Sequence, residues 1–152
     1  MNRLSAQRGF NKLGFVLAIS VIGIVITAFL SRVDGIQAES ERTEVELTIR
    51  NMRVGLQLAV GDHIMGGRDE QIRNLLERNP FRFLERLPSG YEGEAMLPSR
   101  AGGWVYDPLR RVLAYQPRLK ESFPGRELLR WHYEAVAAPG DRLAGLRISS
   151  IE

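Results

Sequence analysis

The chain has 152 residues, of which 44% are hydrophobic and 26% charged, enough for one modest domain besides a membrane segment. It contains no cysteine, which excludes disulfides, thiolate metal sites and cysteine nucleophiles. The formal net charge of +3 comes from Arg3, Arg8 and Lys12, because taking these three from the 21 Lys and Arg leaves 18, equal to the 18 Asp and Glu. A neutral remainder argues against nucleic-acid binding, which needs a clustered basic face.

An uncharged stretch follows these basic residues and covers residues 13–31. At about 1.5 Å of rise per residue, its nineteen residues nearly span a hydrocarbon core of roughly 30 Å. It is longer than the roughly 7–15 apolar residues of a cleaved secretory signal. Ser20 and Thr27 cost little in lipid, because each hydroxyl can bond a carbonyl of its own helix. The basic N-terminal side predicts a single-pass inner-membrane protein with a cytoplasmic N-terminus and a periplasmic C-terminal domain.

The junction Gly9-Phe10, with Arg8 before it and the uncharged stretch after it, resembles the processing site of type IV pilins and type II secretion pseudopilins. In that family a basic leader ends in Gly, a prepilin peptidase cuts after it, and the new N-terminal Phe is methylated. The resemblance implies a leader at residues 1–9, a transmembrane helix segment at 10–31 and a helix continuation at 32–62. It also implies other pilin-like subunits and inner-membrane assembly proteins as partners.

Gly14 departs from the family pattern, which has Glu at the fifth mature position. In the family's filaments that carboxylate is held to neutralise the N-terminal amine of a neighbouring subunit, since a Glu in hydrocarbon is expensive unless paired. Gly14 therefore leaves two interpretations: a minor subunit at a filament tip, where certain pseudopilins also lack the Glu, or a membrane protein that never assembles. For assembly, the small residues Gly14, Ala18, Ser20 and Gly23 would permit close approach of helices.

Helical signals continue beyond the uncharged stretch. Val45, Ile49, Met52, Leu56 and Val60 recur three or four residues apart and form one helix face. An alternating strand pattern competes over residues 45–60, but no strong turn signal interrupts residues 31–61, so a helix is preferred. A broad apolar face needs a partner, and a packed sheet would supply one.

A group of acidic residues follows the membrane exit: Asp34, Glu39, Glu41, Glu44 and Glu46. Two interpretations are open. The group could face basic residues of a neighbour in a filament, or it could be a solvated helix face, which is the commoner use of such a run.

The remainder, residues 63–152, is expected to form a globular α+β domain, so that the fold class is a long helix packed on a small antiparallel sheet, as in pilins. Gly66-Gly67 breaks the chain, and Asn79-Pro80 ends a short second helix expected at 68–78. The later expected elements are turns at 81–84 and 88–91, a hairpin of 103–106 and 111–115, and strands at 129–135 and 143–151.

Aromatic residues at strand spacing are expected to form the core rather than a recognition surface. Apolar and polar residues alternate from Leu129 to Ala135, which predicts a strand with one buried and one solvated face. The aromatic residues concerned are Trp104, Tyr106, Tyr115, Trp131 and Tyr133.

Residues that could carry chemistry are sparse. His63 follows Asp62, a pair that could ligate a metal but is commoner as a solvated helix end, and His132 is expected on a polar strand face. No Gly-x-Ser-x-Gly elbow or phosphate-binding glycine loop is present. The sequence therefore predicts no enzyme activity, no cofactor and no metal site.

Two functions remain open at the level of the sequence. The first is a minor pilin- or pseudopilin-like structural subunit, processed between Gly9 and Phe10. The second is an uncleaved single-pass inner-membrane protein whose periplasmic domain binds a partner in an envelope complex.

Overall fold

The computed structural model describes residues 7–137 and 143–151. It forms two compact units, residues 1–38 and 39–152. One helix, α1 (Gln7–Met65), supplies most of the first unit and begins the second. The second unit adds a five-stranded sheet, so the chain has an α+β fold with a long apolar N-terminal helix, as expected.

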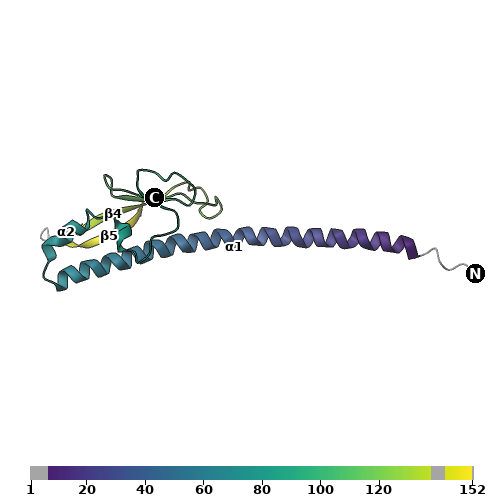
Figure 1. Ribbon diagram of the computed structural model, residues 1–152, viewed down its shortest axis with the longest axis horizontal. Coiled ribbons are helices and arrows are strands. Elements are labelled where there is room, and N and C mark those ends of the chain that lie inside the picture. The colour runs from purple at the N-terminus through teal and green to yellow at the C-terminus, as the bar shows by residue number, and fades with distance from the viewer. Residues whose placement is uncertain (1–6, 138–142, 152) are drawn as a thin grey trace, which may run out of the picture. The chain divides into compact units, whose positions relative to one another are not determined.

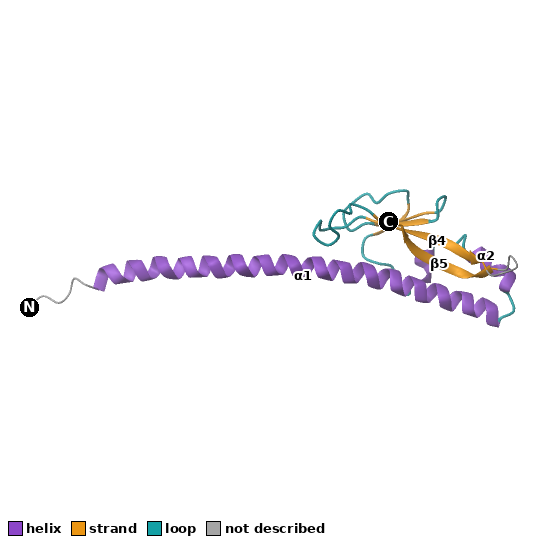
Figure 2. Ribbon diagram, turned by 180° about the vertical axis from the view of Figure 1, so that it is seen from behind, coloured by secondary structure: helices purple, strands orange, loops and turns teal. Residues whose placement is uncertain are grey.

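Helix α1 ends where Gly66 and Gly67 form a turn, and Gly67 takes a positive φ of 63° that suits glycine. Three short helical turns follow, η1 (Asp69–Gln71), α2 (Ile72–Leu75) and η2 (Pro80–Phe83). Figures 1 and 2 show α2 beside one end of β4 and β5.

The sheet has the order β1-β2-β3-β4-β5, which follows the order of the chain. Neighbouring strands are antiparallel except β1 and β2, which run parallel. The strands are β1 (Tyr91–Glu94), β2 (Trp104–Asp107), β3 (Val112–Tyr115), β4 (Leu129–Ala137) and β5 (Leu143–Ile151).

The predicted helix face is confirmed as the face that enters the core. Val45, Ile49, Met52 and Leu56 are all buried and belong to the main hydrophobic cluster, and Val60 is buried in a smaller cluster nearby. Burial of such side chains stabilises the fold by about 1.5–3 kcal/mol each. The alternative strand interpretation of residues 45–60 is therefore wrong.

The aromatic residues form the other half of the core, as expected. Trp104 packs against Tyr115 and Trp131, with ring centroids 4.5 Å and 5.5 Å away, and meets Phe81 edge-on at 5.9 Å. Tyr133 is fully buried and its hydroxyl donates to the Leu75 carbonyl at 2.8 Å. These rings are packing residues rather than an exposed recognition surface.

Three features differ from expectation. The second helix is shorter than 68–78, because its start is the 3-10 turn η1 and α2 ends at Leu75, and the extended Asn79 before Pro80 prevents the helix from resuming. Strand β1 was not expected, since its sequence Tyr-Glu-Gly-Glu has little β propensity, yet it pairs with β2. Ala135 is also exposed, because β4 continues past Tyr133, its last residue in the core cluster.

Gly55 allows the closest approach between α1 and the turns that follow it. A Cβ at this position would overlap the carbonyl oxygen of Phe83. We therefore expect Gly55→Ala to destabilise the second unit by about 2 kcal/mol, because backbone cannot move aside cheaply. Denaturation of the detergent-solubilised full chain, followed by fluorescence of the buried Trp104, measures the change.

Gly61→Ala is the matched control on the same helix, because a Cβ there has no neighbour within 4 Å. We expect it to stabilise the helix by up to about 1 kcal/mol through helix propensity alone. Equal effects of the two substitutions would contradict the close approach at Gly55.

Candidate functional site: an exposed apolar helix segment and a buried carboxylate

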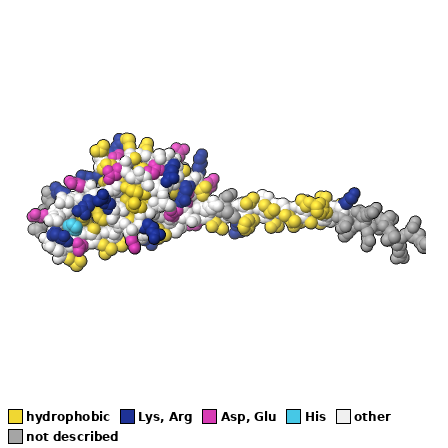
Figure 3. All heavy atoms as spheres, in the orientation of Figure 1, with side chains coloured by type: hydrophobic (Ala, Val, Ile, Leu, Met, Phe, Trp, Pro, Cys, Tyr) yellow, Lys and Arg dark blue, Asp and Glu magenta, His cyan; other side chains and the backbone are white. Residues whose placement is uncertain are grey.

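The first unit presents an apolar surface that nothing in the described structure covers. Among the described residues, one helix is long and apolar enough to cross a membrane by length and composition, and its apolar window is 0% buried. Phe15, Ile24 and Phe29 are each about two-thirds exposed or more. Figure 3 shows hydrophobic side chains over the visible face of this segment. Such a surface is compatible with a single-pass membrane helix.

The hydroxyl groups inside this segment behave as predicted. Ser20 Oγ donates to the Val16 carbonyl at 2.9 Å, and Thr27 Oγ1 donates to the Gly23 carbonyl at 2.9 Å. Both polar groups are satisfied within the helix, so they place no unpaired donor in an apolar environment.

The candidate processing residues Gly9 and Phe10 lie in the first turns of α1 by their backbone. Residues 1–6 of the expected leader are outside the described residues. The junction therefore immediately precedes the apolar segment within one helix.

The four small residues proposed for helix assembly form two pairs rather than one face. Gly14 and Ala18 are four residues apart on one side, and Ser20 and Gly23 are three apart on another. Gly23 follows Gly14 by nine residues, or two and a half helical turns, which places it on the opposite side. All four are exposed, and a Cβ at either glycine would touch nothing within 4 Å.

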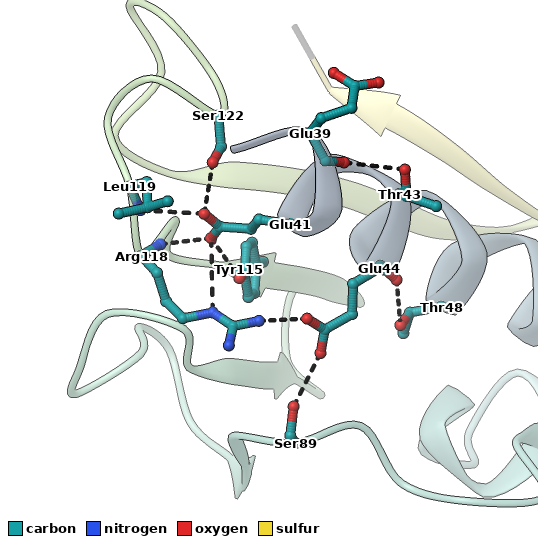
Figure 4. A network of polar contacts seen from close by, with 10 residues as sticks. All are labelled: Glu39, Glu41, Thr43, Glu44, Thr48, Ser89, Tyr115, Arg118, Leu119 and Ser122. Atoms are coloured by element: carbon teal, nitrogen blue, oxygen red, sulfur yellow. Dashed lines mark hydrogen bonds and ion pairs between the residues drawn. The ribbon is translucent and has the colours of Figure 1, made fainter. Parts of the chain in front are cut away.

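In the second unit, the side chain of Glu41 is only 3% exposed and is surrounded by donors. Its Oε1 accepts from Tyr115 Oη at 2.7 Å and from the Arg118 amide at 2.6 Å. Its Oε2 accepts from Ser122 Oγ at 2.6 Å and from the Leu119 amide at 3.1 Å. Figure 4 shows α1 joined in this way to the end of β3 and the loop after it.

These contacts set the ionisation of Glu41. Burial disfavours the charged form, but the hydrogen bonds from Ser122, Arg118, Tyr115 and Leu119 together outweigh burial and hold the pKa of Glu41 below its usual value. Burial, with the neighbouring carboxylate, raises the pKa of Tyr115. Glu41 is thus a charged, fully satisfied group at neutral pH.

The acidic residues expected after the membrane exit differ in their exposure and in their contacts. Glu39 and Glu46 are exposed, as a solvated helix face requires, whereas Glu44 binds Arg118 and accepts from Ser89 Oγ at 2.9 Å. Both interpretations included Glu41 and both are wrong for it, because its carboxylate is buried and bound within its own chain. Its position four residues before Val45, on the buried helix face, was the available signal.

The histidines belong to no metal-binding group in the described part of the chain. His63 Nδ1 contacts the Ala59 carbonyl at 2.8 Å, while Asp62 pairs with Arg68 at 3.0 Å. No group of three potential ligands occurs among the described residues.

His132 lies on the solvated sheet face near Ser149 and Glu134, a combination that could suggest a nucleophile triad. Ser149 Oγ donates to Glu134 Oε1 at 3.0 Å rather than to the histidine, and Arg147 binds the same carboxylate oxygen. The histidine therefore does not stand between serine and carboxylate, as a general base would.

The chain thus combines an exposed apolar helix segment with an α+β unit in which Glu41 fixes a loop to the helix. No protein-family model, curated protein or solved structure matches it. Its function is inferred from its residues and their geometry.

Replacing Glu41 with Gln should strongly destabilise the second unit. Each carboxylate oxygen accepts from one hydroxyl and one main-chain amide. The amide nitrogen of Gln cannot accept from that main-chain N–H, and the hydroxyl beside it would have to turn to accept instead of donate. We expect a loss of about 3 kcal/mol. Glu46→Gln is the control, since its side chain is 76% exposed, and should change stability by less than about 0.5 kcal/mol.

The contribution of Glu41 should also depend on pH. A carboxyl whose folded pKa is depressed stabilises the fold fully above its unfolded pKa, near 4.5, and loses this effect as pH falls through the folded value. The stability difference between wild type and Glu41→Gln should therefore be constant near neutrality and shrink below about pH 4.5. A difference that does not vary with pH would contradict a charged Glu41.

Proposed function

We propose that this chain is a minor pilin- or pseudopilin-like structural subunit of a type IV pilus or type II secretion filament. It is cut between Gly9 and Phe10 by a prepilin peptidase and assembles through its N-terminal helix. The observation that supports this most is the placing of the Gly9-Phe10 junction directly before an exposed apolar segment. That segment continues, within α1, into the helix on which the sheet packs.

The position of the cut has a physical consequence. Because cleavage would remove only residues before the apolar segment, the mature protein would keep its membrane helix, with its folded unit in the periplasm. The same exposed apolar surface could then leave lipid for contact with other pilin-like subunits, helped by inner-membrane assembly proteins. The two small-residue pairs, Gly14 with Ala18 and Ser20 with Gly23, offer close approach on two sides of the helix.

Gly14 bears on the place of the subunit in such a filament. Without a carboxylate at this position, the chain cannot neutralise the N-terminal amine of a neighbour through that residue. A place at the tip, where one side of the subunit meets no neighbour, is consistent with this loss.

Intact mass and N-terminal peptide mapping test the proposal directly. Membrane-extracted protein should begin at Phe10, with a methyl group there, only when a prepilin peptidase is present. Gly9→Leu should leave the longer, uncut chain, whereas Gly14→Ala, beyond the cut, should be processed normally. A chain that begins at Met1 in both backgrounds would refute the proposal.

The second candidate function is a permanent membrane anchor carrying a protein-binding periplasmic unit, and Gly14 is the observation that favours it. If the apolar segment only anchors, then exchanging residues 13–30 for an unrelated membrane helix should preserve function in the cell. If the segment assembles a filament, the same exchange should abolish function while leaving the amount of membrane-bound protein unchanged.

A further inference from the structure

An arginine-lined groove runs along one side of α1 within the second unit. It encloses about 350 Å³ between the helix and the far wall formed by the loop after β3 and strand β4. Three arginines, Arg42, Arg50 and Arg53, and one carboxylate, Glu46, line it together with the apolar side chains of Val45, Ile49, Phe123 and Trp131. The groove thus combines three cations and one anion with an apolar floor, so its lining carries an excess of positive charge.

Two of these arginines are held in place by main-chain carbonyls. Arg42 Nε donates to the carbonyl of Ser122, and Arg53 Nε donates to the carbonyl of Ile148 at 3.0 Å. A guanidinium carries five N–H donors, so these bonds fix each side chain and leave its outer edge able to bind a carboxylate with two parallel bonds.

The charge of these arginines is poorly balanced by the described residues. Arg42 and Arg50 each have a carboxylate oxygen 3.9 Å away, from Glu39 and Glu46, which is too long for a hydrogen bond. Arg53 has no ion pair among the described residues. By contrast, Arg68 and Arg147 pair with carboxylates at 3.0 Å or less elsewhere in the unit.

The spacing of the charges indicates the kind of ligand. Arg42 and Arg53 are eleven residues apart on a helix, or about 16 Å, which matches about five residues of extended peptide. One phosphate or carboxylate group cannot reach both. Phe123, which is only partly buried, offers a hydrophobic side chain a surface between the charges, above the buried Ile49 and Trp131.

We propose that this groove binds an extended acidic segment of a partner protein. Its carboxylates pair with Arg42, Arg50 and Arg53, and an apolar side chain of the segment packs against Phe123 and Trp131. The proposal does not depend on processing at Gly9, because the groove is built entirely within residues 39–152.

The test measures fluorescence anisotropy of a labelled peptide, Asp-Glu-Phe-Glu-Asp, with the full chain in neutral detergent. The peptide should bind, and the affinity should fall as salt is added. The neutral analogue Asn-Gln-Phe-Gln-Asn should bind at least about 10-fold more weakly. The double variant Arg50→Gln with Arg53→Gln should also lose at least about 10-fold.

A matched control removes the same charge elsewhere. Arg82 and Arg86 are exposed and lie outside the groove, so Arg82→Gln with Arg86→Gln should bind within about twofold of wild type. Buried Trp104 and Trp131 report by fluorescence that each variant is folded.

Three results would overturn the proposal. They are equal binding by the groove variant and wild type, equal binding of the neutral peptide, and no binding by wild type up to about 1 mM peptide. If the wild type does not bind the peptide but binds phosphatidylglycerol, and the Arg50→Gln with Arg53→Gln variant loses that binding, the groove contacts a membrane surface instead.

Discussion

The buried carboxylate of Glu41 is the interaction on which the arrangement of the second unit depends. It accepts four hydrogen bonds from the end of β3 and the loop after it, and these bonds fix that loop against α1. The same loop then supplies the Ser122 carbonyl that holds Arg42 and the Phe123 ring that lines the groove. A single satisfied charge therefore organises both the packing of the helix and the far wall of a charged surface.

Helix α1 has two parts with different surroundings, an exposed apolar segment and a segment that packs on the core. Near its N-terminus every described side chain of the uncharged segment is exposed, so the helix there needs lipid or other helices to cover it. Towards its C-terminus a single face carries Val45, Ile49, Met52 and Leu56 into the core, and the other faces mix charged residues with exposed apolar ones such as Leu58. The change follows the distribution of charge, because after Lys12 no charged residue occurs until Arg32.

Sequence reasoning succeeded where a feature depended on local periodicity. The helix face from Val45 to Val60, the hairpin of β2 and β3 and the burial of the aromatic residues all follow from spacing, and the structure confirms them. It failed where a feature depended on distant partners. Strand β1 exists because β2 offers Gly93 and its neighbours a free edge, and no property of the four residues themselves predicts this.

Glu41 is an intermediate case between these two. Its position on the buried helix face was visible in the sequence, but its four donors come from residues 74 to 81 positions away. A buried charge is tolerable only when such donors exist, and their presence cannot be read from helical spacing. The sequence could therefore mark Glu41 as unusual without saying what satisfies it.

The overall neutrality of the chain after residue 12 hides an unequal distribution of charge. Glu41 and Glu44 are turned towards Arg118 and the loop, Glu134 is bound by Arg147, and Asp62 is bound by Arg68. Carboxylates paired in this way leave Glu39 and Glu46, each 3.9 Å from its arginine, as the ion-pair partners of the groove arginines Arg42 and Arg50. Equal totals of acidic and basic residues therefore still permit a short cationic groove of the size that an acidic peptide needs.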